Sequence, residues 1–342
     1  MNEKILRETA LAMVAPGKGL LAADESTATI GKRFEKIGVE NIEPNRQAYR
    51  DMLFTTPGFE QHTSGVILFE ETLFQKSLAG QPFSQLLASK GVIPGIKVDK
   101  GAKPLAAGGP EETVTEGLDG LRERLEKYFA AGARFAKWRA VITIGKGTPS
   151  YNAIHTNAHA LARYAALCQE AGIVPIVEPE VLMDADNTVE TCEKVTDWVL
   201  SEVFQELYYQ KVLLEGIVLK PNMVVSGAKC PTQAGVQEVA ERTLNVLKRR
   251  VPGAVPGIAF LSGGQSDELA TAHLDAMNRI GLSGGNLPWK LTFSYGRALQ
   301  AAALKAWGGK NVDAGKLAHL HRAKMNGLAA LGQWDAKLEK AA

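Results

Sequence analysis

The chain has 342 residues, of which 45% are hydrophobic and 22% are charged, and its formal net charge is +2. These proportions are typical of a globular protein, and no apolar run is long enough to span a membrane. The near-neutral charge argues against nucleic-acid binding, and the Lys248-Arg249-Arg250 run suits the carboxyl end of a helix. We therefore expect neither a nucleic acid nor a membrane as a partner.

Cysteine usage and the first residues point to an intracellular compartment. Cys168, Cys192 and Cys230 form no C-x-x-C pair, and an odd number of cysteines argues against a disulfide framework. Near the amino terminus, Glu3 and Glu8 interrupt any apolar core of the kind that a signal peptide requires. We expect a reduced, cytoplasmic protein.

Short apolar segments alternate with amphipathic ones along the chain. We expect strands over Gly19–Asp24, Gly65–Glu70, Val92–Asp99, Arg134–Ile142, Ile173–Glu180, Gly216–Pro221, Gly257–Ser262 and Lys290–Tyr295. We expect helices over Gly117–Ala131, Ile154–Ala171, Val189–Leu213, Gln233–Arg250 and Ser266–Ile280, with one more after Asp313. A crossover segment after each strand is typical of parallel sheets. The pattern predicts an α/β fold, a single (β/α)8 TIM barrel with extra amino- and carboxyl-terminal helices. It forms one domain over residues 1–342, in which residues 313–342 are a final helix and tail.

Polar and ionisable residues gather where these strands end. They are Asp24, Lys97, Asp99, Lys137, Arg139, Glu178, Glu180, Lys220, Ser262, Ser294 and Arg297. Two such residues in one strand lie two apart, so their side chains share a face. The carboxyl ends of barrel strands are where active sites of this fold lie. A single buried Lys–Glu pair has a structural interpretation as good as a functional one, but a charged residue at so many strand ends favours function.

Two dipeptides place a proline inside an expected strand. Glu178-Pro179 and Lys220-Pro221 should mark points where strand pairing ends, because proline cannot donate to a ladder. The ring also holds the preceding residue extended. Neighbouring lysines disfavour each other's protonated form, so Lys220 beside Lys137 would suit imine formation as a neutral amine.

The segments after the last two strands resemble an anion site. Ser262-Gly263-Gly264 follows one strand, and Ser294-Tyr295-Gly296-Arg297 ends the next. Loops in these two positions commonly bind phosphate in barrels, and arginine adds a bidentate fork. We therefore expect a phosphorylated small molecule as the partner.

The chain offers little sign of a metal site. His155 and His159 lie four apart on an expected helix, but no third ligand stands at a suitable spacing. His319 and His321 are expected to be solvated on the final helix. We predict no metal and no cofactor.

Taken together, these segments resemble class I fructose-1,6-bisphosphate aldolases over residues 3–332. The matching strings are LLAADEST, GIKVDKG, FAKWR, VPIVEPE, LLEGIVLKPNM, FLSGGQS and LTFSYGRALQAAALKAWGG. The resemblance implies a metal-independent lyase of glycolysis and gluconeogenesis that acts on a sugar phosphate, and a homotetramer.

The resemblance also implies roles for individual residues. Lys220 resembles the Schiff-base lysine, Glu178 the general acid and base, and Glu180 its assistant. Asp24 resembles the aspartate that orients the substrate hydroxyl, and Lys137 the lysine beside the imine. The expected ligands of the sugar and its two phosphates are Ser26, Lys32, Arg33, Lys97, Arg139, Ser262, Gly263, Ser294, Gly296 and Arg297.

Two departures from the family stand out. Ala28-Thr29 replaces the usual Gly-Ser after DEST, although Thr29 keeps a hydroxyl. Animal members end in a tyrosine thought to assist proton exchange, whereas residues 313–342 contain no Tyr, Ser or Thr. We expect this tail to be a short helical turn docked on the barrel.

Two other interpretations remain open from the sequence. Another Schiff-base barrel, such as a transaldolase-like enzyme, would share the interior lysine but not the paired phosphate sites. A catalytically idle scaffold would share the fold and form no imine.

Overall fold

Eight parallel strands close into a barrel in the computed structural model, which describes residues 2–340. They are β1 (Gly19–Ala23), β2 (Thr63–Leu68), β3 (Ile93–Lys97), β6 (Phe135–Ile142), β7 (Val174–Val181), β8 (Val218–Leu219), β9 (Gly257–Phe260) and β10 (Lys290–Tyr295). Neighbours follow chain order, and β10 pairs with β1 to close the ring. The predicted (β/α)8 fold is confirmed.

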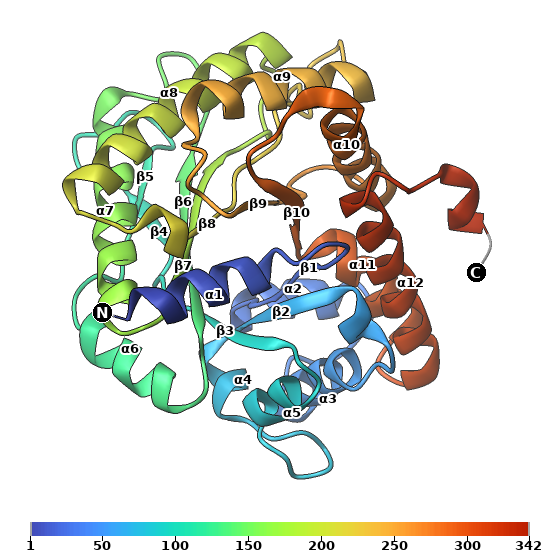
Figure 1. The fold of residues 1–342 in the computed structure, drawn as a ribbon. Coiled ribbons are helices and arrows are strands. Elements are labelled where there is room, and N and C mark those ends of the chain that lie inside the picture. The colour runs from blue at the N-terminus through green and yellow to red at the C-terminus, as the bar shows by residue number, and fades with distance from the viewer. Residues whose placement is uncertain (1, 341–342) are drawn as a thin grey trace.

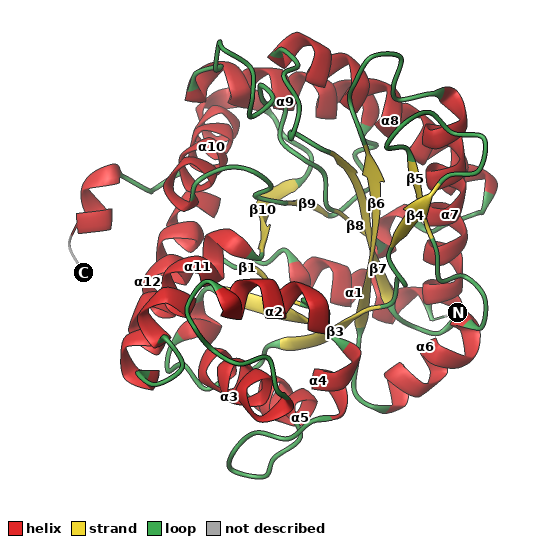
Figure 2. Cartoon of the chain, turned by 180° about the vertical axis from the view of Figure 1, so that it is seen from behind, coloured by secondary structure: helices red, strands yellow, loops and turns green. Residues whose placement is uncertain are grey.

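Helices surround this barrel (Figures 1 and 2). They are α1 (Glu3–Met13), α2 (Thr27–Glu35), α3 (Glu43–Phe54), α4 (Glu70–Phe74), α5 (Phe83–Ser89), α6 (Leu121–Ala130), α7 (Tyr151–Glu170), α8 (Val189–Tyr209), α9 (Val236–Arg250), α10 (Asp267–Ile280), α11 (Arg297–Trp307) and α12 (Val312–Ala330). Ser150 and Thr188 start α7 and α8 by accepting hydrogen bonds from backbone amides that the helix leaves free. None of the helices in the described part of the chain has the length and apolarity needed to cross a membrane.

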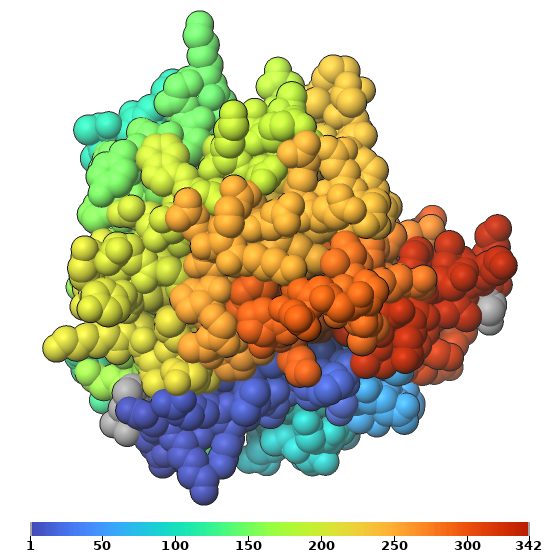
Figure 3. Space-filling view, turned by 45° about the horizontal axis from the view of Figure 1, so that its top comes forward, coloured from blue at the N-terminus to red at the C-terminus, as the bar shows by residue number. Residues whose placement is uncertain are grey.

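The amino-terminal end of the barrel is closed by α1, which crosses the opening in Figure 1. Leu6, Ala10 and Met13 of α1 pack with inward-facing strand residues in an apolar cluster that includes Phe135 and Ile176. In the space-filling view, segments from the second half of the chain cover one side of this blue helix (Figure 3). One end of the barrel is therefore sealed, and only the other can admit a ligand.

Two local expectations need correction, and one element was not predicted. Pairing continues past Pro179 on the β6 side, where Ala140 faces Pro179 and Val141 faces Glu180. Proline has no N–H, and the nitrogen of Pro179 faces β8, where pairing has already stopped, so no ladder bond is lost. The strand expected over Gly216–Pro221 is only two residues long. A small hairpin of β4 (Ala102–Pro104) and β5 (Thr113–Thr115) was not foreseen.

The segment after α12 folds back onto the helices. Trp334 donates its backbone amide to Asp275 of α10 at 2.8 Å, and Glu339 accepts 2.7 Å bonds from Arg322 of α12. The expected short turn is present as a 3-10 helix over Ala336–Lys340. The prediction that His319 is solvated is wrong, because α12 turns this residue inward, where burial lowers its pKa to about 4.

Candidate active site

A cavity of about 650 Å³ lies at the carboxyl ends of the barrel strands. The predicted site residues that line it are Asp24, Ser26, Arg33, Lys97, Lys137, Arg139, Glu178, Glu180, Lys220, Ser262, Gly263, Ser294, Gly296 and Arg297. Lys32 is the exception, because it is exposed on α2 and does not line the cavity. The fold thus brings together residues that lie up to 273 positions apart, from Asp24 to Arg297.

Four buried charged groups form a chain of ion pairs at the floor of the cavity. Lys137 Nζ lies 3.1 Å from Asp24 Oδ2 and 3.1 Å from Glu178 Oε2. The other carboxylate oxygen of Glu178, Oε1, lies 3.1 Å from Lys220 Nζ. Glu178 is 3% exposed and Lys220 4%, so the contact between them is shielded from water. A carboxylate thus bridges two amines.

Strand register places these groups. In β6 and β7, Arg139 stands opposite Glu178 and Val141 opposite Glu180. The spacing of two puts Lys137 and Arg139 on the inner face, as it does Glu178 and Glu180. The two residues of each pair therefore point into the barrel at successive heights along its axis.

Lys220 is held by the backbone that follows β8. Its amide donates to Val177 of β7 at 2.8 Å, which extends the ladder by one residue beyond the strand. Two residues on, the side chain of Asn222 accepts from the Val181 amide at 3.1 Å and donates to Thr196 at 3.0 Å. Hydrogen bonds thus continue beyond the short β8, and they hold the backbone at Lys220 and again two residues later.

The opposite charges in this group of ion pairs stabilise one another. Burial alone would raise the pKa values of Asp24 and Glu178, but the cations around them, Lys137 foremost, outweigh it and lower both. Burial alone would lower the pKa of Lys137, but the carboxylates of Asp24 and Glu178 raise it. For Lys137, the two carboxylates therefore outweigh any repulsion from neighbouring cations.

The rim of the cavity carries groups suited to anions. Ser26 caps α2 by accepting from the Thr29 amide at 3.3 Å, and its hydroxyl lies 3.0 Å from that of Thr29. Gly296 immediately precedes α11, so this second helix also begins at the cavity. A helix amino terminus offers free amides and a positive dipole end to a phosphate. Two such termini face one cavity.

Gly263 leaves room at the rim for a neighbouring carboxylate. A Cβ on Gly263 would lie 2.9 Å from Glu180 Oε1, so a larger residue would displace that carboxylate. The buried hydroxyl of Ser294 has no hydrogen-bond partner among the described residues, which leaves it available to a ligand.

Several lining residues were not predicted from the sequence. Glu25 accepts from Arg33 Nη1 at 2.5 Å and from Gln300 Nε2 at 2.9 Å, and so orients Arg33 at the rim. Its position beside Asp24 was the available signal. Others follow β2 and β3, namely Phe69, Glu70, Lys100, Gly101 and Ala102. These lie where β2 leads into α4 and where β3 leads into β4, in connections that strand patterning does not locate.

A sealed barrel with a buried lysine and two helix amino termini at its open end defines an α/β-barrel enzyme for phosphorylated substrates. A family model described as fructose-bisphosphate aldolase class-I matches residues 5–342. The chain belongs to the class-I fructose-bisphosphate aldolase family, whose members are lyases.

Individual relatives agree with this assignment. A probable fructose-bisphosphate aldolase class 1 of Xanthomonas campestris pv. campestris is 59% identical over 338 residues, covering 98% of this chain and 99% of that protein. The cytosolic fructose-bisphosphate aldolase 4 of Arabidopsis thaliana is 56% identical, covering 96% and 83% respectively. The solved structure of fructose-bisphosphate aldolase from Plasmodium falciparum, in complex with TRAP and an inhibitor, matches with a TM-score of 0.95. It is 51% identical and covers 97% of this chain and 96% of that one.

Proposed function

We propose that this chain reversibly cleaves fructose 1,6-bisphosphate to dihydroxyacetone phosphate and glyceraldehyde 3-phosphate through a Schiff base on Lys220. The observation that carries the proposal is the buried contact between Lys220 Nζ and Glu178 Oε1 at 3.1 Å. An imine-forming lysine needs a base that removes its proton and an acid that expels water, and one carboxylate can serve as both.

Proton flow follows from the charge states of the resting site. Glu178 begins as a carboxylate, because Lys137 and the other cations around it outweigh burial and lower its pKa. Its Oε1 lies 3.1 Å from Lys220 Nζ, where it can accept the proton that the nitrogen loses during attack. The free amine attacks the C2 carbonyl of the open-chain ketose, and protonated Glu178 returns the proton to the carbinolamine oxygen as water leaves. Lys137 lies beside the forming imine, and Asp24 continues to raise its pKa while Glu178 carries the transferred proton.

Cleavage uses the iminium as an electron sink. A carboxylate removes the C4 hydroxyl proton, the C3–C4 bond breaks, and its electron pair moves into the enamine on Lys220. Glyceraldehyde 3-phosphate departs, the enamine is protonated at C3, and water releases dihydroxyacetone phosphate. We assign the orientation of the substrate hydroxyls to Asp24 and assistance in proton transfer to Glu180. Fixed charges in a buried site stabilise such transition states strongly.

The rim residues divide between the two phosphates. We assign the 1-phosphate to Ser262, Gly263, Ser294, Gly296 and Arg297, and the 6-phosphate end to Ser26, Arg33, Lys97 and Arg139. The helix amino termini of α2 and α11 support this division. Lys32 is exposed on α2 and does not line the cavity, so we assign it no phosphate contact.

We also infer the cellular setting from the family. The Arabidopsis relative is named cytosolic, which supports a cytoplasmic enzyme of glycolysis and gluconeogenesis. The resemblance noted from the sequence supports a homotetramer in which residues 1–342 form one barrel domain per subunit.

The proposal is tested by cleavage of fructose 1,6-bisphosphate in a coupled assay. Lys220→Ala should lower kcat by about 1,000-fold or more, because removing a covalent nucleophile abolishes the pathway. Lys146→Ala removes the same charge from an exposed loop position and should retain activity. Treatment with EDTA should leave cleavage intact. Substantial turnover by folded Lys220→Ala protein, or a loss with EDTA that zinc restores, would overturn the proposal.

A further inference from the structure

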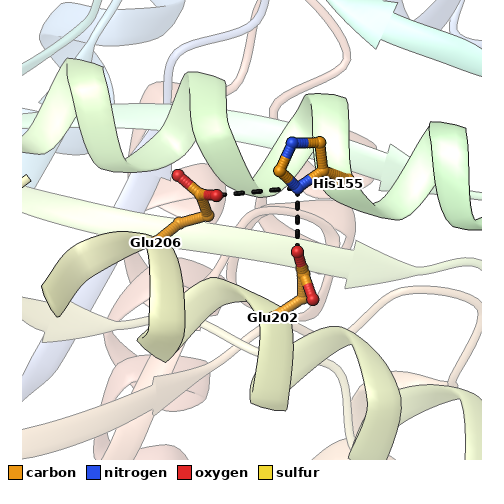
Figure 4. Close-up of side chains that lie close together, drawn as sticks. All are labelled: His155, Glu202 and Glu206. Carbon is orange, nitrogen blue, oxygen red and sulfur yellow. Dashed lines mark hydrogen bonds and ion pairs between the residues drawn. The ribbon is translucent and has the colours of Figure 1, made fainter. Parts of the chain in front are cut away.

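A second group of ionisable side chains lies outside the barrel, between α7 and α8. His155 and His159 are four residues apart on α7, and Glu202 and Glu206 are four apart on α8. Each pair therefore lies on one face of its helix, and the two faces meet. Figure 4 shows His155 pointing from its helix toward both glutamates. The sequence alone offered no third ligand near the histidines, because the fold supplies it from 47 residues away.

The distances are short. His155 Nδ1 lies 2.8 Å from Glu202 Oε1 and 3.5 Å from Glu206 Oε1. Candidate ligand atoms of His155, Glu202 and Glu206 all lie within 4.8 Å of one another. Two ligand atoms of a tetrahedral zinc ion lie roughly 3.4 Å apart when each is about 2.1 Å from the metal. The three side chains thus already have a spacing that one ion could bridge.

Charge is the second observation. Glu206 is 5% exposed, and among residues 2–340 its only ion-pair partners are the two imidazoles. No lysine or arginine of the described chain forms an ion pair with Glu202 either. Buried carboxylates are costly without a cation. A single N–H at His155 Nδ1 can point at only one of the two glutamates, so among the described residues the two carboxylates depend on two imidazoles alone for opposite charge.

Neighbouring contacts restrain the candidate ligands. His159 Nδ1 lies 2.9 Å from Glu206 Oε2, the oxygen that does not face His155. The ring of Tyr151 stacks on His155 with centroids 5.4 Å apart, and its hydroxyl lies 3.4 Å from Glu202. Partners that orient ligating carboxylates and imidazoles are typical of metal sites.

We propose that His155, Glu202 and Glu206 bind one divalent transition-metal ion of the zinc class, with His159 orienting Glu206 and water completing the coordination. Imidazole with carboxylate is a donor set that suits such ions. The ion ties α7 to α8, the helices that follow β6 and β7, and those strands carry Lys137 and Glu178. It acts on stability and not on the chemistry, because none of its ligands lines the catalytic cavity.

Calorimetric titration of chelator-treated protein with zinc chloride tests this proposal. Wild type should bind one zinc ion per chain and gain thermal stability, with cleavage activity unchanged. His159→Gln should weaken binding by about 10- to 100-fold, the usual effect of losing an orienting partner. His155→Gln and Glu206→Gln should weaken it further. His321→Gln is the matched control, because His321 also pairs with a glutamate, Glu339, at 3.1 Å, but that glutamate is already neutralised by Arg322.

Three results would overturn the proposal. The first is the absence of saturable zinc binding to wild type, the second is binding that folded His155→Gln and Glu206→Gln proteins retain, and the third is a thiolate spectrum after cobalt substitution. Cobalt substitution separates the histidine site from the cysteines, because a thiolate ligand would add an intense charge-transfer band. Observation of that band would place the ion on a cysteine and also reject the site.

Discussion

The amino-terminal and carboxyl-terminal halves of the barrel interior share one strand geometry, but the first is lined by apolar side chains and the second by charged ones. In β7, the inward positions Val174 and Ile176 are apolar and join the cluster closed by α1, whereas Glu178 and Glu180, two and four residues later, face the cavity. β6 changes in the same way, from Phe135 to Lys137 and Arg139. Side chains alternate inward and outward in the same way on both sides of this boundary, so the two halves differ only in the types of residue that face inward.

This difference separates stability from function. The amino-terminal half buries side chains that gain free energy on leaving water and seals the barrel. The carboxyl half places charges in a buried environment, where they are tolerated because each has an opposite partner. Substitutions in the first half should change stability with little effect on catalysis, and those in the second should also change the chemistry.

Phe135→Ala should give the largest loss of stability. The Phe135 ring lies against Gly65 of β2 and Gly95 of β3, where a Cβ would come within 2.9 and 2.2 Å of it. Its removal leaves a cavity that the backbone cannot fill, so the free energy of unfolding should fall by about 3–5 kcal/mol. Urea denaturation measures the loss, and kcat of the folded protein should be close to wild type. A stable variant with much reduced kcat would break the division between the halves.

Asp24→Asn should lower the free energy of unfolding slightly less than Phe135→Ala does, and this loss should depend on pH. Burial would raise the pKa of Asp24, but Lys137, Lys97 and Lys220 outweigh it and hold the pKa well below its usual value. The ionised carboxylate therefore contributes stability that is full above about pH 4 and is lost as pH falls further toward the folded pKa. Asp24→Asn should lower the free energy of unfolding by about 3 kcal/mol at pH 7. This is the low end of the range for breaking a buried ion pair, because Glu178 still partners Lys137. The difference from wild type should shrink toward pH 3, and a pH-independent difference would contradict this electrostatic account.

Arg297→Ala should have the smallest effect, and on binding alone. Arg297 starts α11 at the rim of the cavity, and loss of its charged hydrogen bonds should weaken bisphosphate binding by about 1.5–3 kcal/mol. Lys305→Ala, an exposed position on the same helix, is the charge-matched control. The measurement is the Michaelis constant for fructose 1,6-bisphosphate, and an unchanged value would remove Arg297 from the phosphate site.

The sequence predicted the barrel and most of the cavity lining because both depend on local patterns. Apolar strands with polar ends place Lys220 and Glu178 at one rim whatever the detailed packing. The missed features depend on partners distant in sequence. Pairing beyond Pro179 depends on which neighbour its missing amide faces, and the burial of His319 depends on the side of α12 that meets α11. The approach of Glu206 to His155 likewise depends on how two helices align.

Reduction with borohydride in the presence of dihydroxyacetone phosphate, followed by peptide mass mapping, tests the central claim most directly. Borohydride traps an imine as a stable secondary amine, so inactivation should accompany one substrate adduct per chain, located at Lys220. The adduct should be absent from Lys220→Ala protein. An adduct on Lys137 or Lys97 in wild type, or inactivation without any adduct, would contradict the assignment of Lys220 as the nucleophile.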